Sequence, residues 1–333
     1  MSRFQRRFAP ISFIFALSFI IYSCGQLDVN TDNIIRLDCD SFTAVDHESF
    51  DTDLSNGINS CISTNYKHYN VVLDNLQYGS DKMPVLIYTP KSGFDYVVVL
   101  IHGGPRSMVT LGNNPIDSPF ADERAVMIIP VYMGSLNRTI YPAPEFEIAL
   151  TGIKSLLDRL SNFRTVILAE SAGAYIASKL PDAAFRRMVL VMPAFASPKT
   201  VYDRILEMRC QGQPEGRESE CRFGSMYARS AVDGRQVEIK GHDNLLNFFG
   251  EQHYHDLSPG RAFVRFCPFM ILDQTDRRIA FDLYEDRLDA TCYQSLNRVG
   301  GFSHEILLNP EGPKVVWEKI KRVGEGGYAP TPI

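Results

Sequence analysis

The sequence predicts a three-layer α/β fold, in which helices cover both faces of a mostly parallel β-sheet. Runs of consecutive apolar residues that are rich in β-branched side chains are typical of strands buried on both faces. Segments with helical periodicity alternate with these runs along the chain, as in parallel sheets with crossover helices. With 333 residues, 45% of them hydrophobic, the chain is long enough to bury a large core.

The first part of the predicted main domain contains a β-hairpin, two helices and four buried strands. The segments 69–78 and 83–90 flank a Gly-Ser-Asp turn and predict a β-hairpin. An amphipathic helix is predicted at 144–161, because its apolar residues fall on one helical face, and a further helix at 172–180 ends before Pro181. Four buried strands are expected in the apolar runs YVVVLI, AVMIIPVY, RTVILA and RRMVLVMPAF, which are residues 96–101, 125–132, 164–169 and 186–195.

The alternation of strands and helices stops after the fourth buried strand. Residues 198–260 are polar and rich in Gly, Arg and Glu, so we expect them to form a cap over one end of the sheet. The main domain is predicted to span 66–330. After the cap we expect a strand in AFVRFCPFMIL, a helix in AFDLYEDRLDA, a short strand near YQSLNRV and a last helix in PKVVWEKIKRV, which are residues 262–272, 280–290, 293–299 and 313–323.

Residues 1–24 predict an export signal. Basic residues precede an apolar run that is shorter than the roughly 20 residues of a transmembrane helix. The following I-Y-S-C-G resembles a bacterial lipobox, in which Cys24 would be lipidated, although Tyr22 departs from that pattern. Cleavage without lipidation is the alternative, so we expect an exported protein that is membrane-anchored through Cys24, periplasmic or secreted. Residues 25–65 are predicted to form an acidic tether.

The remaining cysteines are even in number, and an exported chain meets an oxidising compartment in which disulfides persist. Sequential pairing is the simplest expectation for positions 39, 61, 210, 221, 267 and 292. No cysteine or histidine spacing typical of a metal site is found, and the HYHD segment that contains His253 lacks a distant further ligand. We therefore expect no metal and no cofactor. A net charge of -5 favours no nucleic-acid partner.

Ser171 lies between a predicted buried strand and a predicted helix, in the segment LAESAGAY. Nucleophile elbows have the pattern G-x-S-x-G in this setting, because small residues let the strand and the helix approach closely. Gly173 fits the pattern, and Ala169 replaces the first Gly with the next smallest residue. We interpret Ser171 as a nucleophile. An ordinary serine at the start of a helix is the alternative.

A nucleophilic serine needs a base and an acid that orients the base, in the chain order Ser, Asp or Glu, His. Three of the histidines after Ser171 fall in the predicted cap, and only His304 lies in a Gly-rich loop before the last helix. The acid follows the FMIL strand. Asp276 is preferred, because Ile279 suits the start of the next helix, and Asp273, at a place often held by Gly, is kept in reserve. For either, a carboxylate that caps a helix is the alternative.

The loop IHGGPRS, after the first long buried strand, offers backbone donors for an oxyanion hole. Backbone N–H groups suit this purpose because they are held in place before the charge develops. We expect the N–H groups of Gly103 and Gly104 on this loop, together with that of Ala172, to form the hole. A simple Gly-Gly turn is the alternative.

Together these segments resemble the α/β-hydrolases, and specifically the catalytic domain of the prolyl-oligopeptidase family of serine peptidases and its esterase relatives. The family usually has Gly where Ala169 and Ala174 stand, and ESAG looks more like carboxylesterases. The resemblance covers about residues 70 to 325 and rests on HGGP, PVYMGS, AESAG, LDQTDRRI and FSHE, which are residues 102–105, 130–135, 169–173, 272–279 and 302–305.

The resemblance implies a three-layer α/β-hydrolase fold whose cap shapes the pocket, since a gating β-propeller does not fit in this length. The VYMGS segment resembles the family's Asn-Tyr-Arg-Gly-Ser, whose Tyr neighbours the oxyanion site. Tyr132 is therefore a candidate substrate-binding residue, with core packing as the alternative, and Glu170 is a second candidate.

We therefore expect an exported serine hydrolase that cleaves a small-molecule ester or a short peptide through an acyl-enzyme on Ser171. Its triad would be Ser171, Asp276 and His304. The alternative is a catalytically silent α/β-hydrolase-like lipoprotein that binds a ligand or a partner.

Overall fold

The computed structural model describes a large part of the predicted main domain. The predicted signal with Cys24, and most of the predicted tether, lie outside the described residues, so the predicted domain boundaries stay predictions. Within the described residues, no helix is both long enough and apolar enough to cross a membrane. The described residues are 35–36, 69–78, 81–90, 93–103, 124–130, 132, 139–140, 145–210, 226–230, 236–239, 241–276, 279–302, 304, 306–308 and 311–326.

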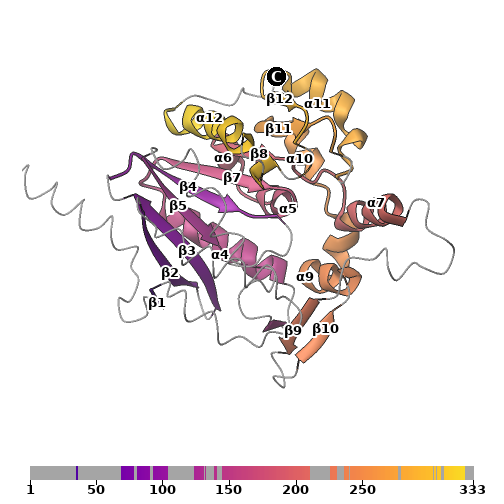
Figure 1. Ribbon diagram of the computed structural model, residues 1–333, viewed down its shortest axis with the longest axis horizontal. Helices are drawn as coiled ribbons and strands as arrows, with labels where there is room; N and C mark the ends of the chain where they lie inside the picture. The colour runs from indigo at the N-terminus through magenta and orange to yellow at the C-terminus, as the bar shows by residue number, and fades with distance from the viewer. Residues whose placement is uncertain are drawn as a thin grey trace, which may run out of the picture.

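A nine-stranded sheet forms the centre of the described structure (Figure 1). The strands lie in the order β1-β2-β3-β5-β4-β7-β8-β11-β12. The strands from β5 to β12 in this order run parallel, and the β2–β3 hairpin joins them antiparallel through β3. The bounds are β1 Ile35–Arg36, β2 Tyr69–Tyr78, β3 Asp81–Pro90, β4 Tyr96–Ile101, β5 Ala125–Pro130, β7 Thr165–Glu170, β8 Met188–Val191, β11 Phe269–Asp273 and β12 Leu296–Val299.

The central strands are buried on both faces. Every residue of β4, β5, β7, β8 and β11 is buried. A strand covered by helices on both sides needs apolar side chains at successive positions, which is why these runs do not alternate with polar residues. The predicted mostly parallel sheet is therefore confirmed.

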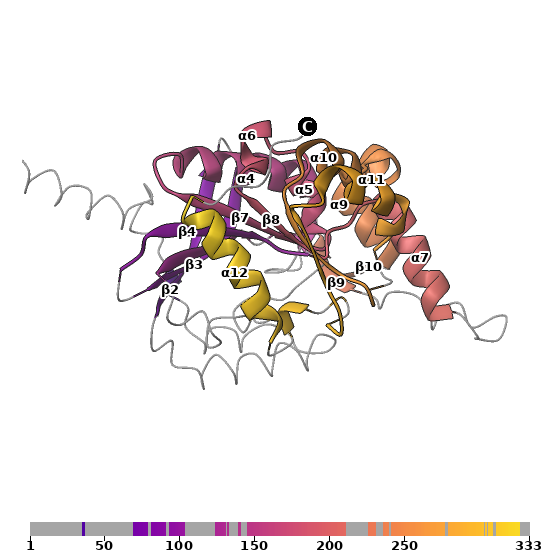
Figure 2. The same cartoon turned by 90° about the horizontal axis from the view of Figure 1, so that it is seen from above.

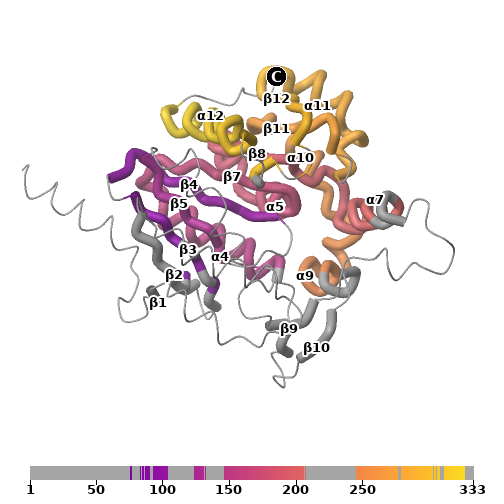
Figure 3. Tube along the Cα trace, viewed as in Figure 1, coloured from indigo at the N-terminus to yellow at the C-terminus, as the bar shows by residue number. Residues whose placement is uncertain are grey.

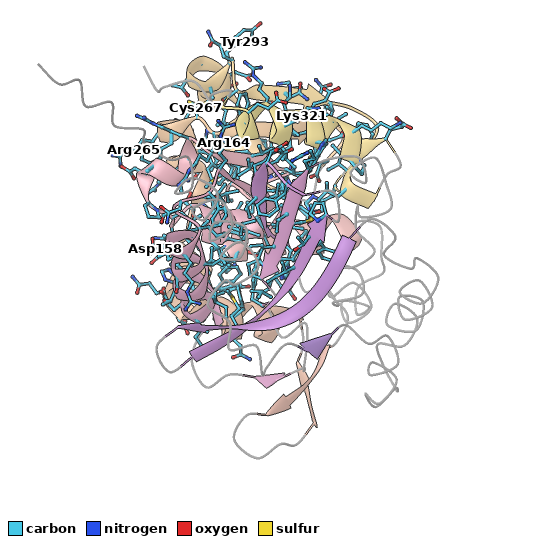
Figure 4. All side chains as sticks on the ribbon, turned by 90° about the vertical axis from the view of Figure 1, so that its left-hand side faces the viewer. Asp158, Arg164, Arg265, Cys267, Tyr293 and Lys321 are labelled. Carbon is cyan, nitrogen blue, oxygen red and sulfur yellow. A yellow bond between two sulfur atoms is a disulfide. The ribbon has the colours of Figure 1, made fainter. Side chains whose placement is uncertain are left out.

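Helices lie on both faces of the sheet, with α12 (Gly312–Gly324) opposite α4 (Glu145–Arg159) in Figure 2. The short helices α5 (Gly173–Ala177) and α6 (Asp182–Phe185) follow β7. The last turn of α12 approaches β4 so closely that a Cβ on Gly324 would lie 3.0 Å from the Tyr96 ring. Side chains fill the space between the layers (Figure 4). Phe146 and Ile153 of α4 and Val316 and Ile320 of α12 are fully buried.

The predicted cap lies beyond the ends at which β4 and β7 finish (Figure 1). In the trace of Figure 3, α9 lies next to α4, which it contacts. The elements of the cap region are α7 Pro198–Cys210, β9 Met226–Ser230, β10 Gln236–Ile239 and α9 Gly241–Asp256, and β9 and β10 form a small sheet with β6 Thr139–Ile140.

One predicted element is wrong. The apolar run at 262–272 predicts a strand, but its first half belongs to the helix α10, Pro259–Phe266. Pro259 stands in the first turn of this helix, a position that favours helix initiation. Cys267 ends the helix in the left-handed conformation, with φ 42°, and β11 begins only at Phe269. A short apolar run does not by itself distinguish a strand from a buried helix.

The later elements agree more closely with the predictions. The predicted helix at 280–290 begins with a 3-10 turn, η3 (Phe281–Leu283), before α11 (Glu285–Cys292). A second 3-10 turn, η4 (Ile306–Leu308), precedes α12.

A disulfide joins Cys267 to Cys292, as sequential pairing predicted. It connects the residue that ends α10 with the last residue of α11, and both sulfurs are buried. Cys267 is labelled near the top of Figure 4, close to Tyr293, which follows Cys292 in the chain. The other predicted pairs involve side chains outside the described residues.

Candidate active site

Ser171 occupies a sharp turn between β7 and α5. Its φ of 48° lies in the left-handed region, which a residue with a side chain rarely adopts. Three backbone hydrogen bonds hold it there. Its N–H donates to the carbonyl of Val191 at 2.9 Å, and its own carbonyl accepts from the N–H groups of Ala174 at 3.1 Å and Ala194 at 3.0 Å. Such strain persists only where the surroundings determine the conformation, and it is typical of functional positions.

Small neighbours make this turn sterically feasible. A Cβ on Gly173 would lie 2.2 Å from the carbonyl oxygen of Ile101. Only glycine at this position therefore lets the start of α5 lie so close to the end of β4. A Cβ on Gly103 would lie 2.6 Å from the Cβ of Ser171. Ala169, in place of the first Gly of the motif, is fully buried. The end of β4 and the serine turn are therefore in direct contact.

The side chains of Ser171, His304 and Asp276 form a chain of hydrogen bonds. The Oγ of Ser171 lies 2.8 Å from Nε2 of His304, and Nδ1 of His304 lies 2.7 Å from Oδ2 of Asp276. Because a carboxylate can only accept, Nδ1 carries the proton shared with Asp276, and Nε2 is free to accept from the serine hydroxyl. The carboxylate of Asp276 is 1% exposed and the imidazole 13%. The arrangement can remove a proton from Ser171 and stabilise the resulting imidazolium.

The parallel sheet brings these residues together. Ser171 follows β7, Asp276 lies three residues after β11, and His304 lies beyond β12. Parallel strands end at the same edge of a sheet, so the loops that follow them meet there. The structure thus brings Ser171, His304 and the preferred acid, Asp276, into hydrogen-bonding contact.

Asp273 has a different set of contacts. Its Oδ1 accepts from the N–H and the hydroxyl of Thr275, both at 2.6 Å, and its Oδ2 accepts from the N–H of Phe302 at 2.7 Å. Its carboxylate is fully buried. The contact to His304 Nδ1 is made by Asp276 and the contacts to the loop backbones by Asp273.

The comparisons with known proteins bear on the fold. No family model and no curated protein matches the sequence. Solved structures do match. An esterase from Pyrobaculum calidifontis superposes with a TM-score of 0.51 at 16% identity, over 87% of this chain and 98% of that one. A thermostable carboxylesterase cloned from a metagenomic library gives 0.50 at 15% identity, over 82% of this chain and 94% of that one. The chain has the α/β-hydrolase fold.

A fungal example agrees with this assignment. Carboxyl esterase 2 from Tuber melanosporum superposes on this chain with a TM-score of 0.51 at 16% identity, over 80% of this chain and 88% of that one. At such identities the likeness concerns the fold, so the chemistry of this chain has to be argued from its own residues.

The predicted oxyanion donors lie beside Ser171 where they are described. Ala172 directly follows Ser171 and is the N-cap of α5. Gly103 directly follows His102 after the end of β4. It is in contact with the serine, because a Cβ added to Gly103 would lie 2.6 Å from the Cβ of Ser171. Gly104 lies outside the described residues.

His102 is held as a neutral, buried imidazole. Its Nδ1 donates to the carbonyl of Gly103 at 2.8 Å, and its Nε2 accepts from the N–H of Tyr132 at 3.4 Å. The Tyr132 hydroxyl donates to the His102 carbonyl, and the two rings stack with centroids 4.0 Å apart. Tyr132 also stacks on Phe248 of α9, with centroids 6.0 Å apart. Tyr132 therefore connects the end of β4 to the cap, a contact that its sequence did not indicate.

The second candidate for substrate contact, Glu170, ends β7 with its side chain buried, at 2% exposure. A role in substrate binding for Glu170 and Tyr132 stays a prediction. Within the described part of the chain, no group of His, Cys, Asp or Glu side chains could hold a metal ion.

Two buried tyrosines, Tyr175 of α5 and Tyr254 of α9, have raised pKa values. Burial, with a smaller contribution from Tyr254, raises the pKa of Tyr175 well above its usual value. Burial, followed by the charges of Asp203 and Tyr202, raises the pKa of Tyr254 to about 12. The Tyr175 ring packs edge-on against Phe249 of α9, with centroids 4.9 Å apart. Both phenols are therefore neutral near pH 7, so this contact between α5 and the cap is uncharged.

Proposed function

We propose that this protein is a serine hydrolase that cleaves an ester or a short peptide through an acyl-enzyme on Ser171. The hydrogen-bonded chain of Ser171, His304 and Asp276 is the observation that carries the proposal. Each group is in the form that nucleophilic catalysis requires: a hydroxyl against an accepting Nε2, and a buried carboxylate against the donating Nδ1.

The proposed reaction has two halves. Ser171 Oγ attacks the substrate carbonyl carbon while His304 Nε2 takes the hydroxyl proton, and the carbonyl electrons move to oxygen. The N–H groups of Ala172, Gly103 and Gly104 are the proposed donors to this oxyanion. Collapse of the intermediate breaks the bond to the leaving group, which receives the proton from His304. Water then repeats the sequence on the acyl-enzyme, releases the acid and restores the Ser171 hydroxyl.

An ester is the favoured substrate class. The solved structures reported above are named as esterases or carboxylesterases, and the ESAG segment around Ser171 resembles that of carboxylesterases. An alkoxide or phenolate leaves more readily than an amine, so ester cleavage also demands less of His304 as an acid. A short peptide is the second class within the same mechanism.

Labelling with a fluorophosphonate probe tests the proposal. The probe phosphonylates an activated serine, so the folded wild-type protein should be labelled and Ser171→Ala should not. Ser178→Ala is the matched control, because Ser178 follows the same helix and its hydroxyl donates to the carbonyl of Tyr175. A folded protein that stays unlabelled would support a catalytically silent binding protein instead.

The substrate class is measured on wild-type protein that has not been treated with the probe. A panel of p-nitrophenyl esters and a panel of peptidyl p-nitroanilides should be compared by kcat/KM. The proposal expects ester hydrolysis that disappears in Ser171→Ala. Hydrolysis of the anilides alone would make the peptide the substrate.

We also propose that the chain is exported and anchored to a membrane through lipidated Cys24. The basic and apolar residues before the I-Y-S-C-G segment support this proposal. In a bacterial host, metabolic labelling with an alkyne fatty acid should modify the wild type and not Cys24→Ser. Cleavage without label in both proteins would make the protein periplasmic or secreted.

A further inference from the structure

We propose that Asp273 is a positioning residue, whose buried carboxylate ties the loop of Asp276 to the loop of His304 and so holds acid and base in register with Ser171. This inference rests on the proposed function. It concerns a carboxylate that the proposed reaction does not itself use.

The contacts of Asp273 end next to both proposed catalytic groups. Oδ1 accepts from the N–H and hydroxyl of Thr275, which directly precedes Asp276. Oδ2 accepts from the N–H of Phe302, two residues before His304. One carboxylate thus bridges the two loops that carry the acid and the base.

The burial of Asp273 strongly favours the hydrogen bonds that form this bridge. Asp273 has no exposed surface, and an unsatisfied buried carboxylate is very costly, so its hydrogen bonds are strongly favoured. Hydrogen bonds to an ionised acceptor are about twice as strong as neutral ones. Displacement of either loop would stretch a charged hydrogen bond at a carboxylate that is buried from bulk solvent.

The histidine loop depends on such a connection. The ladder between β11 and β12 reaches Asp273 and Val299, and Gln274 adds one bond from its N–H to the Val299 carbonyl at 3.0 Å. The chain then passes through Gly300 and Gly301, where an added Cβ would find nothing within 4 Å. The described structure therefore leaves open space beside both glycines. At the end of this turn, Phe302 packs its side chain against the core and donates its N–H to Asp273.

The strand side of Asp273 is also anchored. Its own N–H contacts the sulfur of Met192 at 3.1 Å, and the N–H of Met192 donates to the carbonyl of Ile271 at 2.9 Å. Met192 directly follows β8 and has a φ of 45°. The carboxylate therefore projects from a fixed strand end toward two less restrained loops.

Asp273→Asn tests the proposal with little change in volume. An amide has one acceptor and one donor group, so it can accept from Thr275 or from Phe302 but not from both. We expect kcat to fall roughly 10- to 100-fold with KM within about threefold, because a misplacement near 1 Å is enough for such a loss. The rate constant of fluorophosphonate labelling should fall in parallel, since it reports the reactivity of Ser171 without substrate binding.

Asp289→Asn is the matched control. Asp289 lies on α11 and accepts two bonds from Arg298 of β12 at 2.8 Å, so the change removes a carboxylate that contacts the same strand β12 but neither proposed catalytic loop. It should leave kcat and the labelling rate within about threefold of the wild type. All rates are measured well below the unfolding midpoint of each variant, where a purely structural residue would lower stability but not kcat.

A second variant keeps the proposal testable if Asp273→Asn does not fold. Thr275→Val removes one of the bonds to Oδ1 and retains the backbone N–H. It should lower the labelling rate roughly threefold to tenfold. An unchanged rate in a folded Asp273→Asn or Thr275→Val protein overturns the positioning role. The proposed function survives that result, because it depends separately on the loss of labelling in Ser171→Ala. If the wild type is not labelled, the proposed function fails and this inference fails with it.

Discussion

Replacement of Gly103 by alanine perturbs the contact between the end of β4 and the serine turn. The added Cβ would lie 2.6 Å from the Cβ of Ser171, 3.0 Å from the carbonyl oxygen of Glu170 and 3.3 Å from the Oγ of Ser171. Carbon atoms pack best at about 3.5 Å or more, so the two segments must separate by about 1 Å. The two shortest contacts are to the Cβ of Ser171 and to a backbone oxygen, and neither atom is the free end of a flexible side chain, so the backbone has to move.

The size of the effect follows from this displacement. A shift near 1 Å at a reacting centre can lower the rate about 100-fold. Overpacking of this kind also destabilises a core by about 1–3 kcal/mol. We therefore expect Gly103→Ala to fold, to unfold at a lower temperature, and to react with a fluorophosphonate about 100-fold more slowly than the wild type.

Gly300→Ala is the matched control for this experiment. The same methyl group there meets nothing within 4 Å, although Gly300 lies in the loop that leads to His304. The second-order labelling constant and kcat for a p-nitrophenyl ester are measured for both variants at a temperature where each is folded. The steric reasoning is refuted if Gly103→Ala reacts within about threefold of the wild type, or if Gly300→Ala loses as much.

Three further outcomes can be measured. Replacement of Cys267 and Cys292 by alanine removes a cross-link between residues 25 positions apart. Urea denaturation should show a free energy of unfolding that is lower by about 3.5 kcal/mol. A loss below about 1 kcal/mol would contradict the loop-closure argument. Tyr132→Phe removes the donor to the His102 carbonyl but keeps the stacked ring; thermal unfolding should report a loss of about 1 kcal/mol, and an unchanged midpoint would argue against this bond. The raised pKa of Tyr254 means that the folded state holds this proton more tightly than the unfolded state. Stability should therefore be constant below about pH 9 and fall from about pH 10 toward 12; urea denaturation across this range should show a weaker decline for Tyr254→Phe, and an equal decline would assign the pH dependence to another group.

The central strands show which parts of the fold can be predicted from short segments of the sequence. Each residue of β4 or β7 is buried, and an uninterrupted apolar run is the direct sequence signature of that environment. The segment around Phe263 shows the limit. A strand was predicted there, but Pro259 starts a helix and Cys267 ends it in the left-handed conformation, so the same apolar residues face the core from a helix. Short apolar runs fit both structures, and tertiary packing chooses between them.

The site shows the same division. A motif and the order of the elements predict Ser171 and His304 as catalytic residues, and the structure brings these two side chains into hydrogen-bonding contact. The choice between Asp273 and Asp276 stayed open, since both lie in one short polar loop. The role of Asp273 as a bridge to Phe302 was not foreseen. The Asp-x-Thr spacing with Thr275, which is typical of a local side-chain turn, was the one signal in the sequence.

Local pattern and the order of elements were enough for the class of fold and for the serine turn. Sequential pairing was only the simplest expectation for Cys267, and the structure joins it to Cys292. Only the tertiary structure decided which carboxylate meets His304, that Asp273 joins the two loops, and that Tyr132 links the cap to the end of β4. These contacts join residues 28, 29 and 30 positions apart. Their partners are selected by the parallel register of β11 and β12 and by the packing of the cap, and neither is encoded in any short segment.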